Sequence, residues 1–312
     1  MEARTDRWEA PDLRGTVAVV TGASRGVGRG IALVLGECGA MVYVTGRHPE
    51  KGAARRIRLW TGETKDVPET LPETAELATR RGAGSGGRAT AVYVDHTRDA
   101  EVEALFARIR ETHGYLDVLV NNVWGGYENM EQFSLPFWEQ PVWRWDSMVT
   151  AGARAHFVAS RLAVPLMLER RKGVIVNTSV AWPGGYYDGR LVYSLAKSLV
   201  NDLTWRMAEE LRVHGIAAVA VSPVGAKSAW VSSGEELRAI YAAMESPGGI
   251  ERLHAEDPRV LQGQTPEYIG RAVAALAADP DVLARSGRVL KVSDLAQEYG
   301  FTDIDGRRPS HD

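Results

Sequence analysis

Short apolar runs alternate with longer amphipathic stretches along most of the chain. The runs are rich in valine and largely unbroken, which is typical of strands in a parallel sheet that is covered on both faces. We expect seven such strands, at residues 16–22, 41–46, 89–95, 116–122, 173–179, 216–223 and 287–293. Because amphipathic stretches typical of helices separate these strands, the pattern predicts an α/β fold. We expect a doubly wound parallel sheet with helices on both faces.

Two segments and one terminus depart from this alternation. Residues 48–88 are too long for a simple crossover, and the run "GAGSGG" at 82–87 predicts a flexible turn. Residues 224–265 combine helical patterns with the break "SPGG", and we expect them to form a substrate loop or lid. Residues 1–13 are expected to form a polar tail. No linker divides the chain, so we predict a single domain over residues 1–312.

Composition excludes several classes of function. The net charge of the 312 residues is −3 and no long basic run occurs, which argues against a nucleic-acid partner. The single cysteine, Cys38, lies in an apolar helical run and is expected in the core. The histidines lack ligand spacing, so no metal site is expected. With no apolar leader and no run of about 18 apolar residues, we expect a cytoplasmic protein without a membrane span.

A glycine-rich turn, "TGASRGVGRG", joins the first strand to the next helix. Glycines allow a tight turn and let backbone amides approach a pyrophosphate at the start of the helix. The position of this turn, at the start of the α/β pattern, predicts a dinucleotide site. The residues expected to contact the cofactor here are Gly22, Ser24, Arg25, Gly26, Val27 and Gly28.

The end of the second strand indicates which dinucleotide binds. A carboxylate there would hold the ribose diol of NAD, but the sequence reads "VTGRH", with no acid before Glu50. Arg47 and Arg25 can each form charge-assisted hydrogen bonds to a 2′-phosphate, so NADP(H) is favoured over NAD(H). The alternative is that both arginines are only solvent-exposed. Asp95 and Asn122, which end the third and fourth strands, are cofactor-binding candidates or, alternatively, loop caps.

Tyr193 and Lys197 are four residues apart in a helical stretch and therefore share a face. A free tyrosine titrates near ~10, and a neighbouring ammonium lowers that value. We expect Tyr193 to exchange a proton with the substrate and Lys197 to activate it and bind the nicotinamide ribose. Tyr193, like Lys197, is also expected to contact the cofactor. Ser179, at the end of the fifth strand, can hydrogen-bond a substrate carbonyl. The other tyrosines nearby, Tyr186 and Tyr187, have no such lysine and are expected in the pocket wall.

The segments "TGASRGVG", "LVNN", "NTS" and "YSLAK", in this order and spacing, resemble the short-chain dehydrogenase/reductase family over roughly residues 14–295. The segments "LVNNVWGG", "AGARAHF" and "SGRVLKVSDLAQEYGFTDIDGR" resemble one subgroup of it. The resemblance implies a single Rossmann-like domain, NAD(P)(H), and Tyr193, Lys197 and Ser179 as the catalytic set. It also implies a homodimer or homotetramer packed through the helices at 145–170 and 193–211.

The chain departs from the family pattern at several positions. Trp124 follows the asparagines where the family has a small residue, and Val180 stands 13 residues before Tyr193, where the family has its serine. Gly152 replaces the asparagine that anchors a water in the family's proton relay. After the sixth strand, Pro223 and Ser228 match the family's cofactor-binding proline and threonine more loosely.

The sequence thus predicts an NADP(H)-dependent oxidoreductase that transfers a hydride between nicotinamide and an apolar carbonyl or alcohol. The alternative is a sensor or scaffold with the same fold that binds NADP(H) with little turnover. An apolar small molecule is the expected partner because aromatic residues are frequent near the expected pocket. These residues are Trp124, Trp138, Trp143, Trp182, Tyr186, Tyr187 and Trp230.

Overall fold

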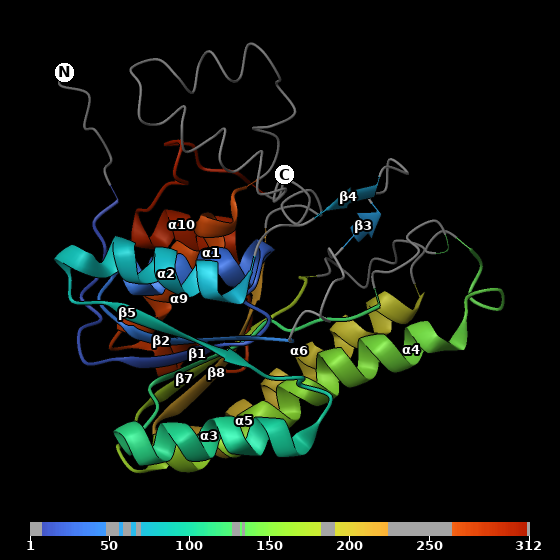
Figure 1. Ribbon diagram of the computed structural model, residues 1–312, viewed down its shortest axis with the longest axis horizontal. Coiled ribbons are helices and arrows are strands. Elements are labelled where there is room, and N and C mark those ends of the chain that lie inside the picture. The colour runs from blue at the N-terminus through green and yellow to red at the C-terminus, as the bar shows by residue number, and fades with distance from the viewer. Residues whose placement is uncertain are drawn as a thin grey trace.

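The computed structural model describes residues 8–47, 70–126, 132, 135–181, 191–223 and 264–310, and the backbone alone at 56–58 and 64–66. Its main feature is a seven-stranded parallel sheet in the order β5-β2-β1-β6-β7-β8-β9 (Figure 1). This confirms the predicted sheet and all seven predicted strands. The strands are β1 (Val17–Val20), β2 (Met41–Gly46), β5 (Arg88–Tyr93), β6 (Val118–Asn121), β7 (Gly173–Thr178), β8 (Ile216–Ser222) and β9 (Val289–Lys291).

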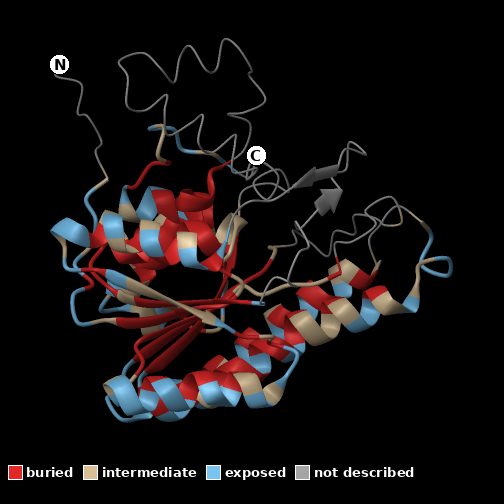
Figure 2. Ribbon diagram, in the orientation of Figure 1, coloured by how far each residue is buried: buried red, intermediate tan, exposed pale blue. Residues whose placement is uncertain are grey.

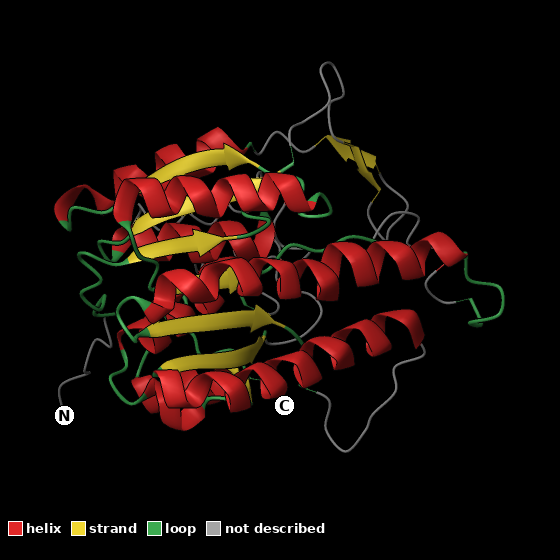
Figure 3. Cartoon of the chain, turned by 90° about the horizontal axis from the view of Figure 1, so that it is seen from below, coloured by secondary structure: helices red, strands yellow, loops and turns green. Residues whose placement is uncertain are grey.

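Helices cover both faces of the sheet, as the pattern predicts (Figures 1 and 3). On one face lie α1 (Gly26–Glu37), α2 (Leu71–Arg81), α9 (Pro266–Ala278) and α10 (Val292–Tyr299). On the other lie α3 (Asp99–His113), α5 (Ala155–Leu168) and α6 (Leu191–Leu211). A π-helical segment at Val149–Arg154 joins α5 to α4 (Val142–Met148), and α4 and α6 extend beyond the sheet.

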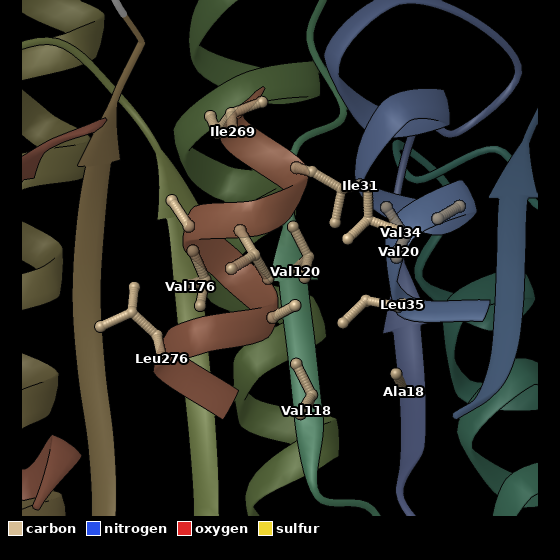
Figure 4. Packing of buried hydrophobic residues seen from close by; sticks show 14 of the residues in the cluster. Ala18, Val20, Ile31, Val34, Leu35, Val118, Val120, Val176, Ile269 and Leu276 are labelled. Carbon is tan, nitrogen blue, oxygen red and sulfur yellow. The ribbon is translucent and has the colours of Figure 1, made fainter. Parts of the chain in front are cut away.

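Successive residues along the strands lie alternately in two separate hydrophobic cores, one on each face of the sheet. Val20, Val120 and Val176 face α1 and α9, where they pack against side chains such as Ile31 and Ile269 (Figure 4). The intervening strand residues join a second core beneath α3, α5 and α6. Because both faces are covered, the strands are buried throughout their central part (Figure 2). Burial on both faces explains why these strands are apolar runs rather than alternating patterns.

The order of the strands in the sheet indicates where a ligand would bind. From β1 the chain runs outward through β2 to β5, then returns across the sheet to β6 on the other side of β1. At such a reversal the loops after neighbouring strands diverge and leave a crevice at their carboxyl ends. The glycine-rich turn follows β1 and Trp124 follows β6, so the two lie on either side of this crevice.

The segment between β2 and α2 contains a short hairpin that the sequence pattern did not predict. Its strands are β3 (Arg56–Arg58) and β4 (Thr64–Asp66), which pair antiparallel outside the main sheet. Helix α2 then begins at a capped terminus, where the Thr70 hydroxyl accepts a hydrogen bond from the Glu73 amide. The long connection is therefore an insertion of a hairpin before an ordinary crossover helix.

The run "GAGSGG" was expected to form a flexible turn, and the structure places a turn here. Residues Gly82–Gly84 form a 3-10 turn that continues α2. Gly87 packs so closely on α1 that a Cβ there would lie 1.9 Å from the Gly36 carbonyl oxygen. The glycines allow two backbone segments to approach each other, a use of glycine that composition alone does not distinguish from flexibility.

Both ends of the described chain pack on the α1–α9 side. Trp8 meets Phe301 edge to face, with ring centroids 5.9 Å apart, and Leu13 is buried. The expected polar tail at 1–13 is therefore packed from Trp8 onward.

Of the expected lid at 224–265, only the last two residues are described. Cys38 is buried as predicted, and burial raises the pKa of its thiol to about 12.

In the described part of the chain, the longest apolar helices fall short of what a bilayer-spanning segment requires.

Candidate active site

The glycine-rich turn after β1 has a backbone that only glycine can adopt without strain. Gly22 and Gly26 have positive φ angles of 66° and 55°. A Cβ at Gly28 would lie 2.4 Å from the Gly22 carbonyl oxygen and 2.4 Å from Asn122 Nδ2. Helix α1 begins at Gly26 with no side-chain cap and no acidic residue in its first turn. The turn therefore leaves the start of α1 open to an anionic group.

Neighbouring strands hold this turn in place. The Ala23 amide donates to the Thr45 carbonyl, which ties the turn to β2. From β6, Asn122 Nδ2 donates to the carbonyl oxygens of Thr21 and Gly22, each at 3.0 Å. The side-chain amide of Asn122 is thus directed at the backbone of the turn. It shapes the predicted cofactor site by supporting it, and a direct contact with the cofactor stays a prediction.

The residues expected around the adenosine lie at the ends of β2 and β5. Arg47 directly follows β2 and is exposed, while Ser24 lies close to Gly46. Asp95 follows β5 and accepts hydrogen bonds from the amide and hydroxyl of Thr97, at 2.9 and 2.7 Å. Burial opposes ionisation of Asp95, but the Thr97 hydrogen bonds and the charge of Arg47 lower its pKa overall. The open helix start and these flanking groups fit a phosphate-bearing dinucleotide.

On the other side of the crevice, Tyr193 and Lys197 lie one turn apart on α6, as predicted. Lys197 is buried, and its Nζ donates to the Thr178 carbonyl oxygen at 3.1 Å. Burial lowers the pKa of the Lys197 ammonium to about 7. A buried cation next to a phenol stabilises the phenolate, so the pair has the electrostatics that proton transfer at neutral pH requires.

Ser179 lies at the end of β7 beneath α6. Its hydroxyl is buried and donates to the Lys197 carbonyl oxygen at 3.3 Å. The next residue, Val180, is partly exposed, and its carbonyl accepts from Asn201 Nδ2. In this rotamer Ser179 braces α6, so its predicted contact with a substrate carbonyl requires the hydroxyl to turn away from the helix.

Trp124 makes contacts that the sequence did not predict. Its ring centroid lies 3.6 Å from Lys197 Nζ and 6.0 Å from the ring centroid of Tyr193, at an interplanar angle of 76°. A Cβ at Gly152 would lie 2.7 Å from Trp124 Cζ3. The glycine at this position therefore makes room for the indole, and the helix there adopts π-helical hydrogen bonding.

A buried row of polar side chains beneath the site also escaped the sequence analysis. Asn121 Nδ2 donates to Ser160 Oγ and to Asn177 Oδ1, and Asn177 Nδ2 donates to Thr204 Oγ1, at 2.8–2.9 Å. These bonds tie α5 and α6 to β6 and β7. The sequence does contain a signal for this row, namely the asparagines Asn121 and Asn177 near the ends of two apolar strands, which pair with each other in the sheet. Buried side-chain amides require hydrogen-bond partners, so such residues predict a polar network.

Other predicted positions are less fully described. Pro223 follows β8 and is partly buried. Ser228 lies outside the described residues, as do four of the aromatic residues expected near the pocket: Trp182, Tyr186, Tyr187 and Trp230. Among the residues that the structure describes, no group of three or more His, Cys, Asp or Glu side chains is placed to hold a metal ion.

Comparisons with known proteins show the family to which the chain belongs. The family model described as short chain dehydrogenase matches residues 65–237. The chain is 37% identical to dehydrogenase/reductase SDR family member 1 of Mus musculus over 298 residues, covering 95% of this chain and 85% of that protein. For the Homo sapiens protein of the same name, the values are 35%, 96% and 86%. This is the subgroup that the sequence segments resemble.

Solved structures share the fold. A metagenomic short-chain oxidoreductase in complex with NADP aligns with a TM-score of 0.61 and 24% identity, covering 89% of this chain and 97% of that one. A putative dehydrogenase from Xanthomonas campestris aligns with a TM-score of 0.70 and 22% identity, covering 96% and 95%. The matched family model and the two mammalian relatives show that the chain belongs to the short-chain dehydrogenase/reductase family of oxidoreductases.

Proposed function

We propose that this enzyme uses NADP(H) to interconvert an apolar carbonyl compound and its alcohol, with Tyr193 as the acid/base. The observation that carries the proposal is the buried Lys197 ammonium one turn from Tyr193, across the crevice from the glycine-rich turn. When bound, the nicotinamide supplies or receives the hydride. Tyr193 donates its phenolic proton to the carbonyl oxygen during reduction, and Lys197 stabilises the resulting phenolate.

The preference for NADP(H) rests on the charges at the end of β2. Arg47 is exposed directly after the strand, and Arg25 immediately precedes α1. A guanidinium can hold a 2′-phosphate with paired hydrogen bonds, and no carboxylate stands between the end of β2 and Glu50 to hold a ribose diol instead. We propose that Asp95, whose pKa is lowered by its Thr97 hydrogen bonds and the charge of Arg47, accepts a hydrogen bond from the adenine amino group.

The apolar character of the substrate is inferred from the surroundings of Tyr193. Met148, Val192 and Ala196 form a small buried cluster, against which Tyr193, Leu191 and Trp124 pack. The tyrosine therefore lies among apolar side chains. Such surroundings favour a ketone, aldehyde or alcohol without charged groups near the reacting carbon.

The decisive test is NADPH oxidation with a panel of apolar ketones and aldehydes. We expect steady turnover that falls by about 10²- to 10⁴-fold in Tyr193→Phe, because the ring is kept and the transferable proton is lost. NADPH affinity, measured by cofactor fluorescence, should stay unchanged. Full turnover in Tyr193→Phe would refute the assignment of the acid.

The rival function is a sensor or scaffold that binds NADP(H) without turnover. Its support is the replacement of two expected polar residues by Gly152 and Val180. The same substrate panel separates the two functions, since tight NADPH binding without oxidation across the panel would favour the sensor.

The role of Ser179 needs its own variant. As a carbonyl partner, Ser179 should lower kcat by about 10²-fold or more when changed to alanine. If Ser179 only braces α6, Ser179→Ala should lower the free energy of unfolding by about 1 kcal/mol and leave kcat unchanged.

We also propose that the enzyme is a homodimer or homotetramer packed through α4, α5 and α6. Large apolar side chains are exposed there, at roughly half of their full surface, as in Phe157, Leu195, Leu199 and Trp205. Burying such side chains between subunits would remove apolar surface from water. Sedimentation velocity of the full chain should show a species of at least twice the monomer mass.

A further inference from the structure

The ammonium of Lys197 is buried without an anionic partner among the described residues. Among the described residues no carboxylate charge acts on the Lys197 ammonium, and its hydrogen bond goes to the neutral carbonyl of Thr178. A buried cation in such surroundings is costly unless something compensates for its lost hydration.

The face of the Trp124 indole lies where a compensating group is needed. At 3.6 Å from the ring centroid, Lys197 Nζ is well within the range of a cation–π contact. The negative face of the ring quadrupole attracts the ammonium, and this attraction is largest where water is excluded. The same ring meets Tyr193 edge-on, so one side chain touches both members of the proposed pair.

Gly152 makes this position of the indole possible. Trp124 comes from the loop after β6, whereas Gly152 lies in the π-helical segment between α4 and α5. A methyl group at residue 152 would approach three atoms of the indole, Cζ3, Cε3 and Cη2, at 2.7–3.2 Å. The large residue at 124 and the missing side chain at 152 are therefore complementary, and together they bring the ring over Lys197.

We propose that Trp124 is a positioning residue for the reaction: its indole face replaces an anionic partner and keeps the Lys197 ammonium charged beside Tyr193. This inference rests on the proposed roles of Tyr193 and Lys197. On this proposal, Trp124 controls the charge in the site by stabilising protonated Lys197, and it does not contact the reacting atoms.

The titratable neighbours of Lys197 in the described chain do not supply the same effect. On α5, burial and the charge of Lys197 lower the pKa of His156 to about 3, so this imidazole stays neutral. Its Nε2 lies 3.2 Å from the Val123 carbonyl oxygen. On α6 itself the titratable neighbour is Tyr193, while β7 contributes the Thr178 carbonyl.

The titration of Lys197 can be measured without turnover. The chain has six lysines, so a protein labelled with ¹³C at lysine Cε gives few signals, and Lys197→Met assigns the one of interest. In the wild type, the ring current of Trp124 should move this signal upfield from the other five. Trp124→Leu keeps apolar bulk but removes the π face, so the upfield shift should vanish. The titration midpoint should then fall by about one pH unit.

Two further variants test the cause. Trp124→Phe keeps a smaller aromatic face and should give a smaller fall in the midpoint. Gly152→Ala places a methyl group against the ring and should shift the midpoint in the same direction as Trp124→Leu. The matched control is Trp8→Leu, because Trp8 also lies under a cation, Arg271 at 5.1 Å, but on the α1–α9 side of the sheet. Trp8→Leu should leave Lys197 unchanged.

The pH profile of alcohol oxidation gives the functional readout. If the lysine loses its proton at lower pH, the phenolate of Tyr193 forms at higher pH, so the acid limb of kcat/KM should move upward in Trp124→Leu. A Lys197 midpoint that is the same in wild type, Trp124→Leu and Trp124→Phe would overturn the inference, even with an active enzyme. Full turnover in Tyr193→Phe would instead overturn the proposed function, while the lysine titration would still decide what Trp124 does.

Discussion

The two sides of the crevice are built on different principles. On the β1–β2 side, the site is a backbone shape, made by glycines that leave no room for a Cβ. It is fixed by the hydrogen bond that the Thr45 carbonyl accepts and by those that the Asn122 side chain donates. On the β6–β7 side, the site is a set of side chains, with Lys197 held between a carbonyl and the face of Trp124. The nucleotide side therefore depends on glycines that have no Cβ atom. The chemical side depends on a charged side chain that is buried away from water.

This difference has consequences for how each side tolerates change. A backbone turn has no substitute for its glycines, because any Cβ meets atoms that cannot move away. On the chemical side, one stabilising group can replace another, because an indole face, a carboxylate or a water can each stabilise an ammonium. The departures from the family pattern at Trp124 and Gly152 both lie on this second side.

The largest expected effect is the loss of NADPH affinity when the glycine-rich turn alone is disrupted. In Gly28→Ala, the new Cβ would lie 2.4 Å from the Gly22 carbonyl oxygen, so the turn must open. We expect NADPH affinity, measured by cofactor fluorescence, to fall by about 100-fold or more. The control is Gly84→Ala, where nothing lies within 4 Å of the added methyl group. Wild-type affinity in Gly28→Ala would show that the turn does not bind the cofactor.

A smaller change on the same side tests which charge it recognises. Arg47→Asp removes a guanidinium after β2 and adds a carboxylate that can hold a ribose diol. We expect NADPH affinity to fall by about 10-fold or more, with NADH affinity unchanged or raised. Arg88→Asp is the matched control, since this exposed arginine starts the neighbouring strand β5 beside Met41, at the end of the strands away from Arg47. If the ratio of the two affinities did not move, the argument for NADP(H) would fail.

The smallest effect concerns stability on the chemical side. Burial lowers the pKa of Lys197 from 10.5 to about 7, so between these pH values the unfolded chain holds a proton that the folded chain has lost. The stability of the wild type should therefore rise from pH 7 to 10.5. Lys197→Met removes the buried cation and should be more stable than wild type at pH 7, by about 2 kcal/mol, with a difference that shrinks as pH rises.

Urea unfolding of both proteins across this pH range measures the effect, and Lys172→Met, at an exposed lysine, serves as control. A stability difference that is constant with pH would mean that Lys197 has its ordinary pKa in the folded protein. Turnover should be lost in Lys197→Met, whereas NADPH should still bind through the glycine-rich turn, with an affinity lowered by the lost contact to the nicotinamide ribose. This outcome would separate the two sides experimentally.

The parts of the molecule that could be predicted from sequence are those with local causes. Each of the seven strands is a continuous apolar run, and burial on both faces of the sheet imposes that pattern directly. The run "GAGSGG" shows the limit of composition, since flexible and tightly packed glycines look alike in a sequence. Only the contact between Gly87 and Gly36 distinguishes them.

By itself, the sequence determined the α/β sheet, the glycine turn between β1 and α1, and the pairing of Tyr193 with Lys197. Each of these follows from residues a few positions apart, whose relative placement the strand or helix period fixes. The tertiary structure decided that Trp124, Gly152 and Lys197 meet, and that the hydroxyl of Ser179 turns toward α6. These contacts join segments far apart in the chain, and packing α5 and α6 on the sheet sets their distances.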